Sequence, residues 1–272
     1  MAALSDEIAD DLVRRINQGE IEPGRRLPTE DELMKRYGVS LNTVRRALDD
    51  LAQRGRIVKQ QGSGSRVPER LRPTVHLASA VRGLPDDERY TRYLERLGGQ
   101  LGEPRLALTV TTVKLEDAER IARLLKLDRF GDKSDLWRRR CDRIFGAKLW
   151  ERQDSYYPGG IAAGTRLRDP VDIEEGTREV LASLGFPQTW SWDVIRAEMP
   201  SHEQQRAFGI GRGVPLLVQE RLAYGGDSEH PERPVRYTET VMPADRHQLM
   251  YTEGATTEDA LEEAMAASSH PD

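Results

Sequence analysis

The sequence predicts an α+β chain with a winged helix-turn-helix domain first and an antiparallel α+β domain after it. Residues 27–67 hold two short helical patterns around a tight turn, followed by two strand patterns with a glycine-rich tip. Residues 106–242 hold alternating and β-branched runs, arranged as hairpins and interrupted by short helical patterns. With 272 residues, two domains are the natural count.

Composition and charge restrict the class of protein. Hydrophobic residues make up 37% and charged residues 32%, which suits a well-solvated globular protein. A pI near 5.7 excludes a uniformly basic nucleic-acid coat, so any phosphate-binding charge has to be local. The single cysteine, Cys141, excludes an intrachain disulfide and fits a reducing compartment. The acidic N-terminus is unlike a secretory signal and no apolar run approaches the ~20 residues of a membrane span, so we expect a cytoplasmic, nucleoid-associated protein with no membrane partner.

Three helices are predicted in the first domain. Residues 5–18 carry one apolar face and form an ordinary packing helix. Thr29 begins a second helix, with Glu32 at capping-box spacing, and Gly38 ends it. Ser40 caps a third helix, whose apolar stripe at i, i+3, i+4 and i+7 spacing consists of Val44, Ala47, Leu48 and Leu51.

The third helix turns polar residues away from that stripe. Asn42, Arg45 and Arg46 are hydrogen-bond donors suited to base edges and phosphates. From residue 35 to residue 66 there are eight basic residues and two acidic ones, in a chain whose formal net charge is −5. Such segregated positive charge is what phosphate binding needs, so we expect this domain to bind double-stranded DNA.

A two-strand wing follows the third helix. Residues 56–59 and 65–67 are the two strand patterns, and Gln61-Gly62-Ser63-Gly64 is the tip between them. A backbone without Cβ can approach a DNA groove closely or adopt positive φ, so Gly62 and Gly64 are suited to a tip that contacts DNA.

These motifs strongly resemble the GntR family of transcription regulators; the matching text is residues 21–30, 37–40, 43–48 and 62–65. The resemblance implies a homodimer that reads a palindromic operator, with the third helix in the major groove and the wing in the minor groove. It places the DNA contacts at Ser40, Asn42, Thr43, Arg45, Gln61 and Gly62. Leu41 and Asp31 depart from the family pattern, in which arginine is common, so the resemblance does not fix the operator sequence.

Domain boundaries follow from the change of pattern. We place the DNA-binding domain at residues 1–70, a proline-containing linker at 71–88, the second domain at 89–251 and an acidic flexible tail at 252–272. Strands are expected at residues 107–113, 136–145, 148–157, 190–198, 216–224 and 235–242. Helices are expected at residues 117–127, 174–184 and 201–208, and residues 90–97 are compatible with a short helix.

The second domain resembles UTRA, the effector domain of the HutC subfamily, whose fold is similar to that of chorismate lyase. The matching text is residues 137–140, 154–158, 199–219 and 234–240. The resemblance implies a domain that binds a small-molecule effector and dimerises. The hairpin near Gly146 departs from the subfamily, which usually has proline soon after that glycine, so the pocket residues are not transferred by the resemblance.

One candidate for the effector pocket is the pair Tyr237 and Glu239. Alternate residues of a strand share a face, and Glu239 puts a carboxylate on a largely apolar one. That carboxylate could accept a hydrogen bond from a ligand hydroxyl or amine, or it could form an ordinary ion pair.

Two further pairs are candidates on neighbouring strands. Arg138 and Arg140 share a face, and their guanidinium groups could clamp a phosphate or carboxylate, or belong to a solvated basic strand. Asp154 and Tyr156 share a face of the next strand and form the weakest pair.

The sequence does not favour a metal site, a dinucleotide site or a catalytic site. The five histidines show no ligand spacing, so we expect no metal site. Residues 209–213 are glycine-rich but follow a helix and precede a strand, the reverse of the dinucleotide fingerprint, so we expect no cofactor. The sequence contains no recognisable set of acid, base and nucleophile, so we expect no catalytic residues and no enzyme activity.

The function expected from the sequence is therefore transcription regulation. We expect a sequence-specific repressor that a small-molecule effector releases from its operator. Two alternatives stay open at this point: an architectural or partition DNA-binding protein without an effector, and a lyase-like enzyme domain fused to a DNA-binding head.

Overall fold

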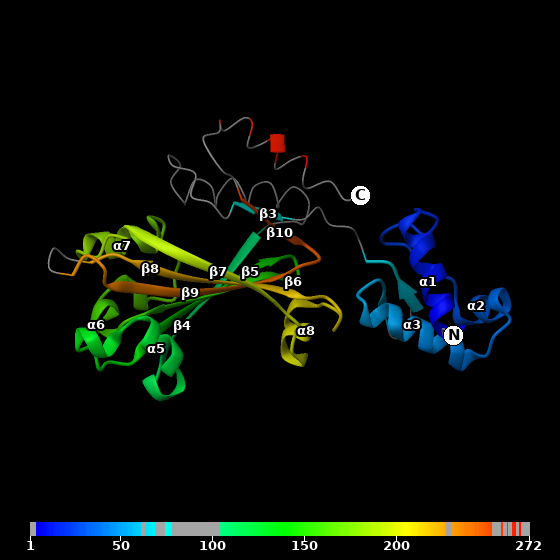
Figure 1. Cartoon of the computed structure of the whole chain (residues 1–272), viewed down its shortest axis with the longest axis horizontal. Coiled ribbons are helices and arrows are strands. Elements are labelled where there is room, and N and C mark those ends of the chain that lie inside the picture. Colours follow the sequence, from blue (N-terminus) through cyan, green and yellow to red (C-terminus); the bar gives the residue numbers. More distant parts are fainter. Residues whose placement is uncertain are drawn as a thin grey trace. The chain divides into compact units, whose positions relative to one another are not determined.

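A computed structural model describes residues 4–60, 64–68, 74–77, 104–226 and 230–251, and the isolated positions 257, 260, 263, 264 and 267 (Figure 1). The chain forms two compact units. One contains the N-terminal helices, and the other contains most of a six-stranded sheet. The predicted order, a helical winged domain followed by an antiparallel α+β domain, is confirmed.

The N-terminal domain is a three-helix core with a two-stranded wing. Its helices enclose one apolar cluster that includes Leu12, Leu33 and Leu51, each fully buried. The wing strands pair antiparallel, with Val58 opposite Arg66. The elements are α1 (Leu4–Asn17), α2 (Glu30–Tyr37), α3 (Leu41–Gln53), β1 (Val58–Gln60) and β2 (Gly64–Arg66).

Local caps mark the beginning and the end of α2, at the residues that the sequence predicts. The Thr29 hydroxyl accepts the Glu32 amide, and the Glu32 carboxylate accepts the Thr29 amide at 2.8 Å, which is a complete capping box. Gly38 ends α2 in the left-handed region, at φ 64°. The Tyr37 hydroxyl donates to the Asp11 carboxylate at 2.6 Å and ties α2 to α1. The two ends of α2 are therefore specified by local hydrogen bonds as well as by the core.

The second domain is built on a sheet with strand order β4-β5-β6-β9-β8-β7 (Figure 1). The β4–β5, β5–β6 and β6–β9 pairings are antiparallel. In register, Arg140 faces Asp154, which in turn faces Glu239, so polar side chains run across the middle of one face. The strands are β4 (Pro104–Val113), β5 (Leu136–Phe145), β6 (Lys148–Tyr157), β7 (Trp190–Glu198), β8 (Leu216–Tyr224) and β9 (Pro234–Pro243).

Two apolar clusters anchor helices to this sheet. One joins Tyr157 and Val235 to residues of α6 and α7. The other joins Leu222 and Tyr237 to the segment around α5. Figure 1 shows α5, α6 and α7 near the same end of the strands. The helices are α5 (Glu119–Leu124), α6 (Gly159–Ala162), α7 (Gly176–Ser183) and α8 (His202–Phe208), with a 3-10 turn at Arg166–Arg168.

The helix expected at residues 117–127 is divided in the structure. A 3-10 turn at Leu115–Asp117 precedes α5, and a second one at Leu127–Phe130 follows it. Lys126 lies between them at φ 52°, a left-handed conformation that ends an α-helix. The apolar residues still pack on the sheet, so the prediction was right about the buried face and wrong about the continuity of the helix.

A short parallel pair of strands was not predicted. β3 (Thr74–Leu77) pairs with β10 (His247–Met250), with Thr74 opposite His247. β3 lies inside the stretch expected to be a linker, residues 71–88, so part of that stretch is strand. The helix considered at residues 90–97 lies outside the described residues, as do Gln61, Gly62 and most of the expected tail.

Substitution of Thr29 tests whether its side-chain cap stabilises α2. Thr29→Ala removes the hydroxyl that accepts the Glu32 amide and should cost about 1 kcal/mol in the stability of α2, whereas Thr29→Ser should cost much less. Hydrogen exchange should accelerate over residues 30–37 in the alanine variant. Equal protection of this helix in both variants would show that the Thr29 hydroxyl does not stabilise the start of α2.

Candidate nucleic-acid interface and ligand pocket

The N-terminal end of α3 presents the residues expected to contact DNA. Asn42, Arg45 and Arg46 are exposed, opposite the buried stripe of the helix. Ser40 accepts the Thr43 amide at 3.3 Å, and the two hydroxyl groups lie 2.9 Å apart. A helix N-terminus favours anions through its dipole and unpaired amides. The five positions therefore form one polar face over the first turns of α3.

Arg45 is held in place by an acidic partner. Its Nε lies 3.1 and 3.2 Å from the two carboxylate oxygens of Glu30, the first residue of α2. Both side chains are exposed, 54% for Arg45 and 38% for Glu30. An exposed ion pair is worth less than about 1 kcal/mol, so Arg45 can exchange this partner for a base or a phosphate.

The base of the wing continues this surface. Gly64 has φ +79° and open space around the position of a Cβ. The Lys59 ammonium lies 2.6 Å from the Asp49 carboxylate of α3, which ties the wing to that helix. The remaining expected wing contacts, Gln61 and Gly62, lie outside the described residues.

The second unit contains a cavity of about 250 Å³. Tyr156, Tyr237 and Glu239 line it from the sheet, and residues 117–121 line it from the helical side. Three of the residues expected at an effector pocket therefore come together around one cavity. Such a volume corresponds to roughly eight water molecules at ~30 Å³ each, which is room for a small metabolite.

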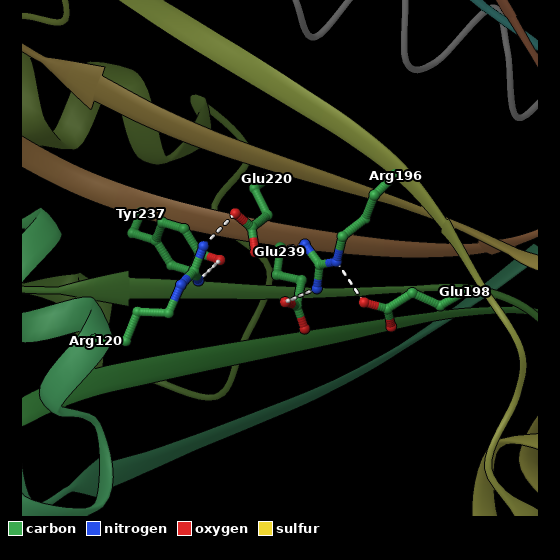
Figure 2. Close-up of polar contacts among 6 residues, drawn as sticks. All are labelled: Arg120, Arg196, Glu198, Glu220, Tyr237 and Glu239. Carbon is green, nitrogen blue, oxygen red and sulfur yellow. Dashed lines mark hydrogen bonds and ion pairs between the residues drawn. The ribbon is translucent and has the colours of Figure 1, made fainter.

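A chain of charges runs beside this cavity (Figure 2). Arg120 donates to the Glu220 carboxylate at 2.6 Å and to the Tyr237 hydroxyl at 3.1 Å. On its other side Glu220 accepts a hydrogen bond from Arg196, which also pairs with Glu198. The guanidinium of Arg196 reaches the Glu239 carboxylate at 3.4 Å, the longest contact of the chain. Glu239 is therefore the most weakly paired carboxylate of this group.

Glu220 and Glu239 have opposite pKa shifts. Burial alone would raise the pKa of Glu220, but hydrogen bonds from Arg120 and Tyr237 and the charges of Arg120 and Arg196 bring it below its usual value. Burial raises the pKa of Glu239, and the charge of Arg196 offsets only part of that effect. Ionised Glu220 therefore stabilises the fold, whereas ionised Glu239 costs folding free energy.

The arginine clamp expected at residues 138 and 140 is not open in this structure. Arg140 makes a bidentate pair with Asp154, at 2.7 Å for each contact. Arg138 faces Tyr156 across the strand pair, and its Nε has no hydrogen-bond partner among the described residues. Neither these two arginines nor Asp154 lines the cavity.

Arg120, Arg196 and Glu220 were not singled out by the sequence. Glu220 did leave a signal, because it alternates with the buried residues Val218 and Leu222 on β8. A carboxylate in such a position needs a cationic partner. Arg120 could not be found this way, since it reaches Glu220 from a separate helix 100 residues earlier in the chain.

Two features are absent from the described part of the chain, a membrane-spanning helix and a metal-binding cluster. No helix there is long and apolar enough to cross a membrane. The same residues contain no group of three or more His, Cys, Asp or Glu that could hold a metal ion.

Comparison with known proteins adds two family matches. The model of the bacterial regulatory proteins of the gntR family matches residues 4–67, and the model of the UTRA domain matches residues 105–248. The first match covers α1, α2, α3 and the wing, and the second covers the six-stranded sheet and the cavity.

Individual relatives align with this chain over most of their length. The histidine utilization repressor of Pseudomonas putida is 26% identical over 257 residues, which are 91% of each chain. An HTH-type transcriptional regulator of Mycobacterium tuberculosis is 27% identical over 244 residues, 86% of this chain and 83% of that one. A solved structure assigned to the GntR family covers 93% of this chain and 98% of its own, with a TM-score of 0.58 and 21% identity, and supports the fold.

The two glutamates can be separated by experiment. Glu220→Gln should lower the free energy of unfolding by about 2 kcal/mol, because it leaves two arginines without their buried partner. Glu239→Gln should leave it unchanged or raise it. All four tryptophans lie between residues 137 and 192, so urea unfolding followed by tryptophan fluorescence reports on the second domain.

The pH dependence of these variants follows from the signs of the shifts. The pKa of Glu220 is lowered on folding, so its stabilisation is present above its unfolded pKa of about 4.5 and is lost as the pH falls further. The difference between wild type and Glu220→Gln should therefore shrink below that pH. If Glu239→Gln were as destabilising as Glu220→Gln at neutral pH, Glu239 would be a structural residue.

Proposed function

The chain belongs to the GntR family of bacterial regulatory proteins and carries a UTRA domain, and from this we propose that it is a sequence-specific transcriptional repressor released from DNA by a small molecule. The observation that carries the proposal is the presence in one chain of an exposed, donor-rich α3 face and a cavity on a separate unit. The named repressor of Pseudomonas putida, similar over nine-tenths of this chain, supports the same function.

The DNA-binding half of the proposal assigns roles to five positions on α3. Asn42, Arg45 and Arg46 read base edges or phosphates in the major groove, while Ser40 and Thr43 hold the helix N-terminus and can contact a phosphate. We assign Gln61, Gly62 and Gly64 to the wing contact. A homodimer on a palindromic operator follows from the docking geometry of helix-turn-helix proteins, in which two recognition helices read two half-sites.

The regulatory half assigns the second unit to ligand binding. A ligand can shift a two-state protein only by binding one state more tightly, so the effector has to prefer one arrangement of the two DNA-binding domains. We propose residues 1–70 as the DNA-binding domain, residues 71–88, which include β3, as a linker and residues 89–251 as the effector-binding and dimerisation domain. We assign residues 252–272 to an acidic tail. Tyr156, Tyr237 and Glu239 are the proposed effector contacts, since they line the cavity.

The pocket favours this function over the alternatives. An architectural DNA-binding protein has no use for a cavity beside a carboxylate whose ionisation costs stability. A lyase-like enzyme would need an acid, a base and a nucleophile around the reacting group. We instead assign the charged residues that line the cavity to ligand binding, because a fold does not by itself imply an activity.

Arg45 tests the recognition surface. Arg45→Ala should weaken binding to a specific duplex by about 1–3 kcal/mol and relax the sequence preference at the contacted base. Arg14→Ala is the matched control, because Arg14 is 63% exposed on α1 and pairs with Asp11. Fluorescence anisotropy with a duplex selected by the wild-type protein measures both. Equal affinity of wild type and Arg45→Ala would remove Arg45 from the DNA contacts.

A further inference from the structure

We propose that the ligand of the cavity is a small organic cation, whose protonated nitrogen sits against the Glu239 carboxylate beside the rings of Tyr156 and Tyr237. This inference rests on the proposed function, in which the cavity is the effector site. It adds the chemical class of the effector.

The network of ion pairs beside the cavity contains one more carboxylate than guanidinium groups. Two guanidinium groups, Arg120 and Arg196, serve three carboxylates, those of Glu198, Glu220 and Glu239 (Figure 2). Glu220 takes the close contacts from both arginines, and Glu239 receives only the 3.4 Å contact. A cationic ligand group would supply the missing partner.

The rim of the cavity adds further negative charge. Asp117 and Glu119 line it and are exposed, with Glu119 also paired to Arg123 at 3.3 Å, and Arg120 is the one basic residue among the described residues of the lining. Arg120 is itself neutralised by Glu220 at 2.6 Å. An entering molecule therefore meets a net negative field, which attracts cations and repels carboxylates and phosphates.

Two arginines near the cavity are engaged by protein carboxylates, and a third, Arg138, faces Tyr156 but does not line the cavity. Arg140 is saturated by Asp154 with two contacts of 2.7 Å, and Arg196 is shared among its three carboxylates. A ligand carboxylate or phosphate would have to displace one of these protein carboxylates and leave it unpaired. An amine needs no such exchange, because Glu239 has acceptor capacity to spare.

The aromatic wall suits the same ligand. The ring centroids of Tyr156 and Tyr237 lie 6.0 Å apart with a 46° tilt, and both side chains line the cavity. Ring faces attract cations within about 6 Å of the centroid. Arg120 already uses this attraction, with its guanidinium carbon 5.8 Å from the centre of the Tyr237 ring.

Burial of Glu239 supports a binding role over a structural one. Burial, together with the nearby carboxylates of Glu220 and Asp154, raises the pKa of this carboxyl, so Arg196 compensates its ionised form only in part. An ammonium or amidinium group would restore the compensation on binding and lower that pKa again. The stability cost of Glu239 thereby becomes a source of affinity for cations.

Three aromatic compounds of equal shape test the ligand class on the full-length protein. Benzylamine, benzyl alcohol and benzoate share a ring and differ in bearing a cation, a neutral hydroxyl and an anion. Benzylamine should raise the melting temperature and show saturable binding in ligand-observed NMR, and the other two should bind roughly tenfold more weakly or worse. This comparison uses the wild-type protein, so it does not depend on the folding of a variant.

Matched variants locate the site. Glu239→Gln keeps the shape of the side chain and should reduce benzylamine affinity by roughly tenfold or more. Glu116→Gln is the control, because Glu116 is 74% exposed, pairs with Lys114 and does not line the cavity. The double change Asp117→Asn with Glu119→Gln should weaken binding less, and its effect should fade with added salt.

The outcomes separate the ligand class from the proposed function. Preference for benzoate, unchanged benzylamine affinity in Glu239→Gln, or no benzylamine binding at millimolar concentration would each overturn the cationic class. A protein that releases its selected DNA duplex with benzoate would remain a repressor with a different effector. A protein that selects no DNA sequence would refute the proposed function, whatever benzylamine does.

Discussion

The buried carboxylate of Glu220 organises the second domain. Its side chain is only 5% exposed, yet it carries a charge on the buried face of β8, between Val218 and Leu222. Arg120 from α5 and Arg196 from β7 meet at this carboxylate, so one residue joins a helix, the edge strand and the interior of the sheet. Because the arginines are committed to Glu220, Glu239 is left with one long contact. The cavity therefore has a weakly paired carboxylate, Glu239, in its wall.

The N-terminal domain depends on a different kind of interaction. Its helices are held by an apolar core, and short-range caps at Thr29, Gly38 and Ser40 define where α2 begins and ends and where α3 begins. These caps also leave the polar face of α3 exposed. Local hydrogen bonds thus define the ends of the helices that present Asn42 and Arg45.

The sequence predicted the elements well where the signal was local. Caps, glycine stops and alternating strands depend on residues a few positions apart, and β5, β6, β7 and β8 have the expected bounds. The elements that the sequence did not predict depend on contacts between residues far apart in the chain. β3 is four residues long and is stabilised by pairing with β10, about 170 residues later, which no local pattern can reveal.

The same distinction explains the site. Tyr237 and Glu239 were found because they alternate on one strand, and Tyr156 because it alternates on another. The partner that decides the charge balance, Arg120, comes from a distant helix. The expected pair of Arg138 and Arg140 failed to appear as an open clamp because register places Asp154 directly opposite Arg140. Strand register is set by the whole sheet, which the sequence pattern does not specify.

Sequence-specific DNA binding is tested by selecting duplexes from a random library with the full-length protein. Two copies of α3 in adjacent major grooves should recover one short sequence made of two inverted half-sites. Recovery of DNA without sequence preference would contradict this expectation. Such a result would mean that the exposed face of α3 binds phosphates alone, as an architectural protein does.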